Sequence, residues 1–374
     1  MILLDINDYN MTELPHHSNL QIKLLSRCFR NVSNSYKFYW FLSILDHVLE
    51  SESAFISLDE ISLRMLSSVW YPLDFYKLSF GVQDGFKDLA TNVSSYIKVD
   101  NSPKAKTLYH QIENDLPDDI SKTLKHKIKV GLKRWVVFRF LSPFFEDQLK
   151  GMRDQKVNDT IQKLTHSSDF IDFAPYKIVT DGIVLSTNWI AYFKDNQYVL
   201  RGFIKWHLVK FLQRNNSNVV GLTEKLEKPT IRNLKTARSF WSVFLKNNNS
   251  KCLYSGLTLP KNNFSLDHFI PWSYVAHDQL WNIIPTTKSV NSSKSDSLPS
   301  LSYYLDAFCE FQYAALKFHI IEGNNKLLED FHSLFRESNL MSIEKSYFFD
   351  IIKTEISNNY RIAENLGFKS SYIY

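Results

Sequence analysis

The residues of this chain that could do chemistry lie close together, between Lys251 and Pro299. They are an acid, a histidine, two amides and a cation: Asp267, His268, Asn282, Asn291 and Lys294. Hydrolysis of a phosphodiester needs a nucleophile, a stabiliser for the extra negative charge and help for the leaving oxygen. These residue types can supply all three, so the set points to phosphoryl chemistry at one site.

Short elements must position these residues. Residues 251–256 are expected to form a short strand entering a turn, and 264–273 a second strand with the Asp-His pair at its centre. A loop over 278–285 carries Asn282, and 286–294 is expected to form a short helix with Asn291 on it. Neighbours on a strand point to opposite faces, so the Asp-His pair shares one face only if the strand bends.

Three segments follow one another at spacings that resemble the HNH nuclease family: Asp267-His268-Phe-Ile-Pro271, Asn282-Ile-Ile-Pro285 and Asn291-Ser-Ser-Lys294. The intervals are 14 residues from His268 to Asn282 and 9 from there to Asn291. The tail after Asn291 is also similar to the end of the HNH domain in RNA-guided CRISPR nucleases. The resemblance covers residues 251–299 of 374. It implies a ββα-metal fold, a hairpin and then a helix around one divalent cation.

This resemblance gives each residue a role. Mg²⁺ prefers oxygen ligands and keeps several waters, so Asp267 and Asn291 are the expected metal ligands. Histidine titrates near neutrality and can take a proton from water, the catalytic role expected of His268. Asn282 is expected to bond backbone groups and pin the loop that orients this base. Lys294, one helical turn after Asn291, is expected to hold a phosphate.

Each residue also has an ordinary interpretation. Asp-His is a common dipeptide, and Asn282 taken alone suits a turn. Asn291 and Lys294 taken alone suit the surface of a helix. The order, the spacing and the context of a hairpin followed by a helix favour the active site.

The cysteines depart from many HNH members, which bind a structural zinc through Cys-x-x-Cys pairs. Here Cys252 is followed by Ser255, and no pair lies near Asn291. We expect no structural zinc, so packing must hold the hairpin. The residues expected to do so are Tyr254, Phe264, Phe269, Trp272 and Trp281. His277 is either an extra metal ligand or, as we expect, a solvent-facing loop residue.

Composition excludes several other classes. With 44% hydrophobic and 22% charged residues, the chain can bury a core and is not a disordered chain. Only 10 Gly and 11 Pro argue against a many-stranded β fold and favour helices. The apolar runs are too short to span a bilayer, and the first residues lack the features of a signal peptide. Three widely spaced cysteines exclude a disulfide framework, so we expect a reduced, cytoplasmic protein with no membrane partner.

The expected fold is mainly α with a small α+β module. Helices are expected at 34–49, 57–69, 122–138, 188–214 and from Pro229 to 247, and a hairpin at 176–185. Pro72 should end the second of these helices at Trp70. The expected domains are a helical recognition or regulatory domain, 1–235, and an HNH nuclease domain, 236–374. The latter has its ββα-metal core at 249–301 and C-terminal helices at 302–374.

Two basic blocks suggest contact with a polyanion. Ten Lys or Arg and two acids lie from Lys205 to Lys251, and seven Lys or Arg with no acid from Lys122 to Arg139. Such a stripe gives DNA affinity and can position a nuclease. The expected contacts are Lys294, Lys235, Arg238, Arg232 and Lys246. The alternative is that these charges are solvated or paired with acids elsewhere. The aromatic stretch 36–42 could stack bases, but core packing is favoured because it is apolar on all sides.

The resemblance implies a Mg²⁺-dependent DNA endonuclease, with Mn²⁺ able to substitute. Water activated by His268 would attack phosphorus and leave 5′-phosphate and 3′-hydroxyl ends. A large helical region beside such a module suggests restriction or anti-phage defence. Two alternatives stay open: a nucleic-acid-binding protein that keeps the HNH fold without turnover, and an RNase using the same site. DNA is the expected partner. A homodimer, or a partner protein encoded nearby, would allow double-strand cutting, because one HNH module cuts one strand at a time.

Overall fold

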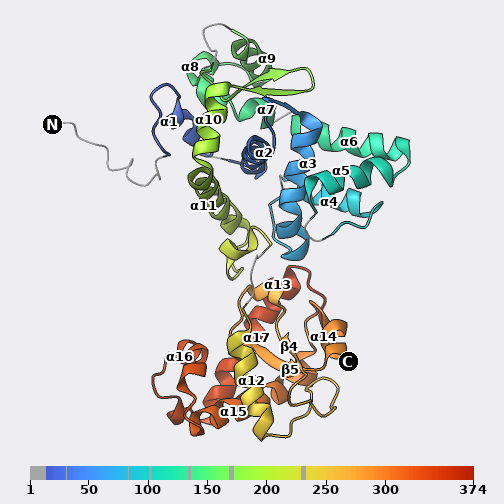
Figure 1. Ribbon diagram of the computed structural model, residues 1–374, viewed down its shortest axis with the longest axis vertical. Coiled ribbons are helices and arrows are strands. Elements are labelled where there is room, and N and C mark those ends of the chain that lie inside the picture. The colour runs from blue at the N-terminus through green and yellow to red at the C-terminus, as the bar shows by residue number, and fades with distance from the viewer. Residues whose placement is uncertain are drawn as a thin grey trace, which may run out of the picture. The chain divides into compact units, whose positions relative to one another are not determined.

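A computed structural model describes residues 14–30, 32–82, 84–100, 103–133, 136–167, 172–228 and 233–374. The chain divides into two compact units, Met1–Ser217 and Asn218–Tyr374, here called the helical unit and the C-terminal unit. In Figure 1 the first runs from blue to yellow-green and the second from yellow to red. The described residues are mainly helical with two small sheets, as predicted. The expected division, after residue 235, falls inside the second unit.

The helical unit is built around α2, Tyr36–Glu50. Its sequence is apolar on all sides, and Phe38, Trp40 and Phe41 are fully buried. The aromatic stretch therefore packs the core, as favoured, and the base-stacking alternative is wrong for it. Among the helices that pack against α2 are α3 (Leu58–Trp70), α10 (Thr187–Asp195) and α11 (Gln197–Asn215).

Helix α3 begins and ends as its sequence predicts, and a π-helical turn follows it. Ser57 caps the N-terminus by accepting a hydrogen bond from the amide of Glu60. Asp59 and Glu60 lie in the first turn, where the helix dipole favours acids. The α-helical bonding ends at Trp70, but the chain continues as a π-helical turn, Tyr71–Phe75. Pro72 lacks an amide hydrogen, and the wider turn accommodates that missing bond.

The predicted hairpin at 176–185 is confirmed as β2 (Tyr176–Val179) paired with β3 (Gly182–Leu185). The strand β1, Phe55–Ser57, pairs with the other edge of β3 and was not predicted. Three residues are too few for a period-two pattern to show in sequence. Glycine is required at 182, because a side chain there would collide with the carbonyl of Ile56.

One of the predicted helices is divided, and residues 134–135 of another lie outside the described residues. The helix expected over 188–214 is α10 and α11, which meet at Asn196. The side chain of Asn196 bonds the carbonyl of Tyr192 and so competes with the helical ladder. The basic helix expected over 122–138 is α6 (Asp118–Lys133) followed by α7 (Val136–Arg139). The unit also contains α1 (Ile22–Arg27), α4 (Phe86–Ser94), α5 (Ala105–Asn114), α8 (Glu146–Leu149) and α9 (Asp154–Thr165). None of the described helices is long and apolar enough to cross a membrane.

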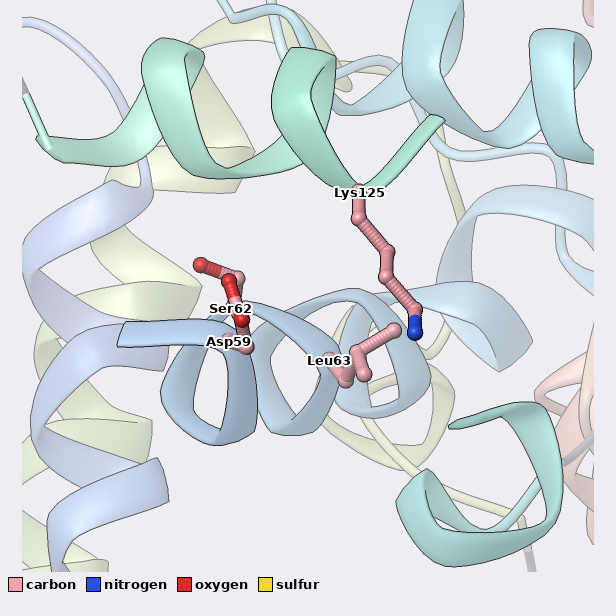
Figure 2. A pocket seen from close by; sticks show the side chains of 4 residues that line it. All are labelled: Asp59, Ser62, Leu63 and Lys125. Carbon is pink, nitrogen blue, oxygen red and sulfur yellow. The ribbon is translucent and has the colours of Figure 1, made fainter. Parts of the chain in front are cut away.

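A small cavity lies between α3 and α6, as Figure 2 shows. Asp59, Ser62 and Leu63 of α3 line it together with Lys125 of α6. Its volume of about 10 Å³ holds at most one water, so it is no ligand site.

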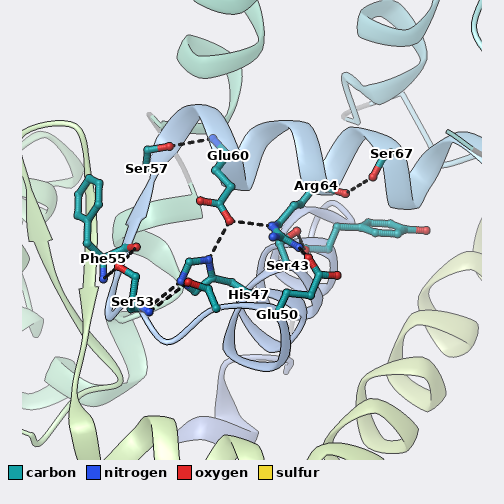
Figure 3. Close-up of polar contacts among 11 residues, drawn as sticks. Ser43, His47, Glu50, Ser53, Phe55, Ser57, Glu60, Arg64 and Ser67 are labelled. Carbon is teal, nitrogen blue, oxygen red and sulfur yellow. Dashed lines mark hydrogen bonds and ion pairs between the residues drawn. The ribbon is translucent and has the colours of Figure 1, made fainter. Parts of the chain in front are cut away.

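A polar network joins α2, α3 and the chain that enters β1 (Figure 3). His47 is buried, with Nδ1 2.8 Å from Glu60 Oε1 and Nε2 2.8 Å from the carbonyl of Ser53. Both partners are acceptors, so only the imidazolium can donate to both. Burial lowers the pKa of His47, but its hydrogen bonds to Glu60 and Ser53 outweigh burial and raise that pKa. Arg64 extends the network by pairing with Glu60 and Glu50.

Replacing His47 with leucine is expected to lower the free energy of unfolding of the helical unit by about 1–2 kcal/mol at pH 6. The pKa of His47 is raised in the folded state, so its contribution is fully present below the ordinary pKa of about 6.5. It is lost as the pH rises through the folded pKa. The difference in free energy of unfolding between wild type and His47→Leu, measured by urea unfolding, should therefore be smaller at pH 9 than at pH 6. An equal difference in free energy of unfolding at both pH values would show that His47 is uncharged in the folded protein.

The C-terminal unit surrounds a two-stranded hairpin with helices (Figure 1). The strand β4, Ser265–His268, pairs antiparallel with β5, Ile283–Thr286. Helix α12 (Lys235–Asn247) packs on β5, and α14 (Lys288–Lys294) packs on β4. The other helices are α13 (Trp272–Val275), α15 (Leu301–Ile321), α16 (Glu329–Phe335) and α17 (Lys345–Asn365). The last three confirm the expected C-terminal helices.

The hairpin is not the expected one. Residues 251–256 contribute only an isolated bridge, between Lys251 and Thr258. The partner of β4 is β5, which the sequence analysis assigned to a loop and the start of a helix. Pro285 hid this strand, because proline cannot donate to a ladder and is found mainly at strand edges. The helix expected from Pro229 to 247 corresponds to α12, which begins at Lys235. Its expected start, residues 229–232, lies outside the described residues.

Candidate active site

Asp267 and His268 lie at the end of β4, opposite two isoleucines of β5. Asp267 pairs with Ile284, and His268 with Ile283. All four residues of β5 are buried, and the indole of Trp241 in α12 donates to the carbonyl of Ile283 at 3.0 Å. β-Branched side chains favour a strand here, and the bond from α12 fixes its position. The Asp-His pair is therefore carried on a well-supported strand.

Asn282 fixes the chain that follows His268. Its side chain is fully buried, with Oδ1 accepting from the amide of Ile270 at 2.8 Å and Nδ2 donating to the carbonyl of Ile270 at 2.9 Å. Its own carbonyl accepts from the amide of Phe269 at 2.8 Å. Asn282 thus bonds backbone groups just after the Asp-His pair, where it can position the histidine rather than touch a substrate.

Each oxygen of the Asp267 carboxylate has a partner. The hydroxyl of Tyr254 donates to Oδ2 at 2.9 Å, and the ammonium of Lys294 lies 3.2 Å from Oδ1. Lys294 also donates to the carbonyl of His268 at 2.7 Å. Burial, reinforced by the Asp267 charge, raises the pKa of Tyr254 well above its ordinary value, so Tyr254 remains a donor at neutral pH.

The position of Lys294 corrects the expected phosphate contact. Its side chain is fully buried and turned from α14 toward β4. Its ammonium already compensates Asp267 and bonds the strand end at His268. A phosphate could reach it only by breaking a buried ion pair, which is costly. Lys294 therefore supports the site from within and does not face nucleic acid.

His268 is paired with Asp278, which the sequence analysis did not select. Its Nε2 lies 2.9 Å from Oδ1 of Asp278. A carboxylate only accepts, so in the neutral imidazole Nε2 carries the hydrogen and the basic lone pair belongs to Nδ1. His268 is 7% exposed and Asp278 20% exposed, so the pair is largely shielded from bulk water. The acid ten residues after His268 was visible in the sequence, but its loop gave no sign of where it would fold.

For the phosphodiester hydrolysis predicted from the sequence, replacing Asp278 with asparagine is expected to lower kcat about 10²-fold or more, because an amide can donate to Nε2 and favour the wrong tautomer. Substrate affinity should change little, since Asp278 faces the histidine. Asp296→Asn, at an exposed position after α14, is the matched control. Single-turnover cleavage rates measure the effect. Equal rates for the Asp278 and Asp296 variants would remove Asp278 from the site.

Asn291 is the other expected metal ligand. It is half-buried on α14, one turn before Lys294. Helix α14 packs on β4, the strand that carries Asp267. Within the described ranges, no three His, Cys, Asp or Glu residues are grouped to hold a metal. Asp267 and Asn291 both offer oxygen donors, the type that a cation such as Mg²⁺ prefers, and their binding of a metal stays a prediction.

His277 differs from the solvent-facing residue that we expected. It is half-buried, with its ring centre 5.6 Å from that of Trp281. Burial, with a smaller effect of the neighbouring His268, lowers the pKa of His277 to about 4. At neutral pH it is uncharged, so it adds no positive charge beside His268.

Packing holds the hairpin, as expected from its aromatic residues. Four of them are buried, namely Tyr254, Phe264, Phe269 and Trp281, and Trp272 is half-buried. Cys252 is also buried, with its sulfur 3.2 Å from the hydroxyl of Thr286. The strand β5 is thus joined to the chain before β4 by apolar contacts and one weak polar contact.

Cations follow one face of α12. Lys235, Arg238 and Lys246 are exposed, and their helical spacing puts them on the same side. The guanidinium of Arg238 donates to the carbonyl of Phe264 at 2.6 Å and covers its ring, so it also holds the chain before β4. Arg232, the fourth expected contact of this stretch, lies outside the described residues. Their contact with DNA stays a prediction.

Residues 252–300 match the family model described as HNH endonuclease. This range contains β4, β5, α13 and α14 together with every residue of the His268 site described above. The resemblance drawn from the three motifs is thereby confirmed. HNH nucleases generally use a divalent metal. Comparison of the whole chain with curated proteins and with solved structures gives no match.

Proposed function

We propose that this protein is a metal-dependent endonuclease that hydrolyses DNA phosphodiesters, using Mg²⁺ with Mn²⁺ able to substitute. One observation carries the proposal: the pairing of His268 with Asp278 inside the segment that matches the HNH endonucleases. An imidazole held by a carboxylate on one nitrogen has the arrangement of an oriented general base.

In this proposal His268 takes a proton at Nδ1 from the attacking water, while Asp278 holds Nε2–H and stabilises the imidazolium that forms. Lys294 bonds the carbonyl of His268 and Asn282 bonds the backbone of Ile270, so the chain at and just after the base keeps its position. When held by Asp267 and Asn291, a divalent cation supplies Lewis-acid stabilisation of the charge on the phosphoryl oxygens. The exposed cations of α12 attract the phosphate backbone and give affinity without sequence preference.

The ion pair between Asp267 and Lys294 favours a second candidate, a nucleic-acid-binding protein that keeps the HNH fold without turnover. A carboxylate that an ammonium already compensates attracts a dication less than an unpaired one. The two candidates agree on DNA binding and differ in cleavage. An RNase with the same site differs only in the sugar that it accepts.

The test compares matched DNA and RNA strands incubated with wild type in MgCl₂, MnCl₂ or EDTA. The proposal expects cleavage of DNA that is lost in EDTA, with 5′-phosphate ends on the products. Preferential cutting of RNA would assign the site to an RNase. Binding of DNA without cutting, in either metal, would favour the binding protein.

Three wider expectations are part of the same proposal: a cytoplasmic location, a homodimer or a partner encoded nearby, and a role in restriction or anti-phage defence. The HNH module, which cuts one strand at a time, supports the dimer or partner, and the large helical unit supports the defence role. The free thiols of the three cysteines support the location.

A further inference from the structure

The C-terminal unit begins before α12, with residues 218–228. This segment contains a left-handed turn at Gly221, with φ +59°, and a 3₁₀ helix, Leu222–Lys225. The side chain of Lys225 is 1% exposed, although lysine is rarely buried without an acidic partner. Its amine instead bonds two backbone carbonyls.

One of these carbonyls belongs to the helix that leads into the active-site loop. Lys225 donates to the carbonyl of Val220 at 2.6 Å and to that of Tyr274 in α13. Helix α13 has four residues, so its last carbonyls lack partners within the helix, and Lys225 supplies one. Burial lowers the pKa of Lys225 to about 7. The charged and the neutral amine can each donate two hydrogen bonds, so both forms can hold the two carbonyls.

Gly221 lies beside the same part of the chain. A side chain at Gly221 would meet the carbonyl of Val275 at 3.6 Å and the Cβ of Ala276 at 3.7 Å. Ala276 has φ +55°, a conformation that is uncommon for a residue with a side chain. Residues 218–228 therefore lie along the turn at Ala276, and Lys225 bonds the helix that leads into it.

This turn leads directly to the partner of His268. Asp278 follows Ala276 by two residues, and its carboxylate lies 2.9 Å from His268 Nε2. At the far end of the loop, the amide of Leu280 donates to the carboxylate of Asp330 at 2.8 Å. The loop that presents Asp278 is thus tied on one side by Lys225 and on the other by Asp330.

We propose that Lys225 is a positioning residue of this site: it holds the turn that presents Asp278 to His268. The inference rests on the proposed function for its kinetic readout. Residues 218–228 are the first residues of the C-terminal unit, so the start of this unit becomes part of the support of the proposed catalytic base.

The test compares full-length wild type with Lys225→Met, which keeps the length of the side chain and removes its donors. Lys228→Met, at an exposed position three residues later, is the matched control. Plasmid nicking in MgCl₂ should show kcat lowered at least about tenfold for Lys225→Met, with KM unchanged. The ring ¹⁵N signals of His268, assigned by their loss in His268→Ala, should change from the Nε2–H pattern to a mixture of tautomers. Lys228→Met should match wild type in both.

Unchanged kcat and unchanged His268 signals in Lys225→Met would overturn the proposal. So would a loss of activity with the wild-type ¹⁵N pattern, because Lys225 would then act on stability alone. If Lys225→Met does not fold, Gly221→Ala takes its place. A smaller shift of the His268 ¹⁵N signals is then expected, and the absence of any shift would overturn the proposal. If wild type cuts no substrate, the proposed function fails, and the ¹⁵N signals alone decide the role of Lys225.

Discussion

Replacing Lys294 with methionine is expected to lower the free energy of unfolding of the C-terminal unit by about 3–5 kcal/mol. The side chain of Lys294 is fully buried, and that of Asp267 is 4% exposed. Methionine fills a similar volume but leaves the carboxylate buried beside a single hydroxyl donor, Tyr254. Calorimetry should show a lower melting temperature for this unit, with the transition of the helical unit unchanged.

The controls for this variant separate charge from shape. Lys288→Met removes an exposed cation from the same helix and should stay within about 0.5 kcal/mol of wild type. The double variant Asp267→Asn with Lys294→Met removes both charges and should recover part of the loss, because the unpaired charge causes most of it. If Lys294→Met and the double variant lost the same free energy of unfolding, the ion pair between Lys294 and Asp267 would not be the cause of the loss.

Replacing His268 with alanine is expected to lower the rate of DNA cleavage about 10²–10⁴-fold, the usual contribution of a general base. DNA affinity should be nearly unchanged, because phosphate contacts from exposed cations supply it. Asp278 is 20% exposed, so water can solvate its carboxylate in the variant, and folding should persist. Rates are measured by single-turnover cleavage, and affinity by fluorescence anisotropy in EDTA.

His277→Ala is the matched control for this variant, since His277 is a second histidine in the same part of the chain. It is uncharged at neutral pH and has no expected part in proton transfer. Its cleavage rate should stay within about tenfold of wild type. If His277→Ala lost as much activity as His268→Ala, the assignment of the base would be wrong.

The sequence predicted the residues that come together better than the elements that carry them. Asp267, His268 and Asn282 lie in one buried cluster because their order and spacing reflect one hairpin. The partner strand of that hairpin was missed, since Pro285 suppresses the pattern of a strand. Long apolar helices such as α2 were predicted well, because a helix that is apolar on all sides is buried in the core.

What could not be predicted depends on contacts between distant segments. A lysine one turn after Asn291 suits a helix surface, and only the packing of α14 on β4 turns Lys294 inward. Asp278 and Lys225 gave no local signal, because their partners lie in other parts of the chain. Sequence spacing therefore located the site, while its supporting contacts required the structure.

The central claim is that His268 acts as the base of a metal-dependent nuclease, and one measurement tests it most directly. Supercoiled plasmid is incubated with purified wild type or His268→Ala protein, in Mg²⁺, Mn²⁺ or EDTA. We predict nicking or linearisation by wild type in either metal, none in EDTA, and none above background with His268→Ala. Equal cutting by both proteins would contradict the claim.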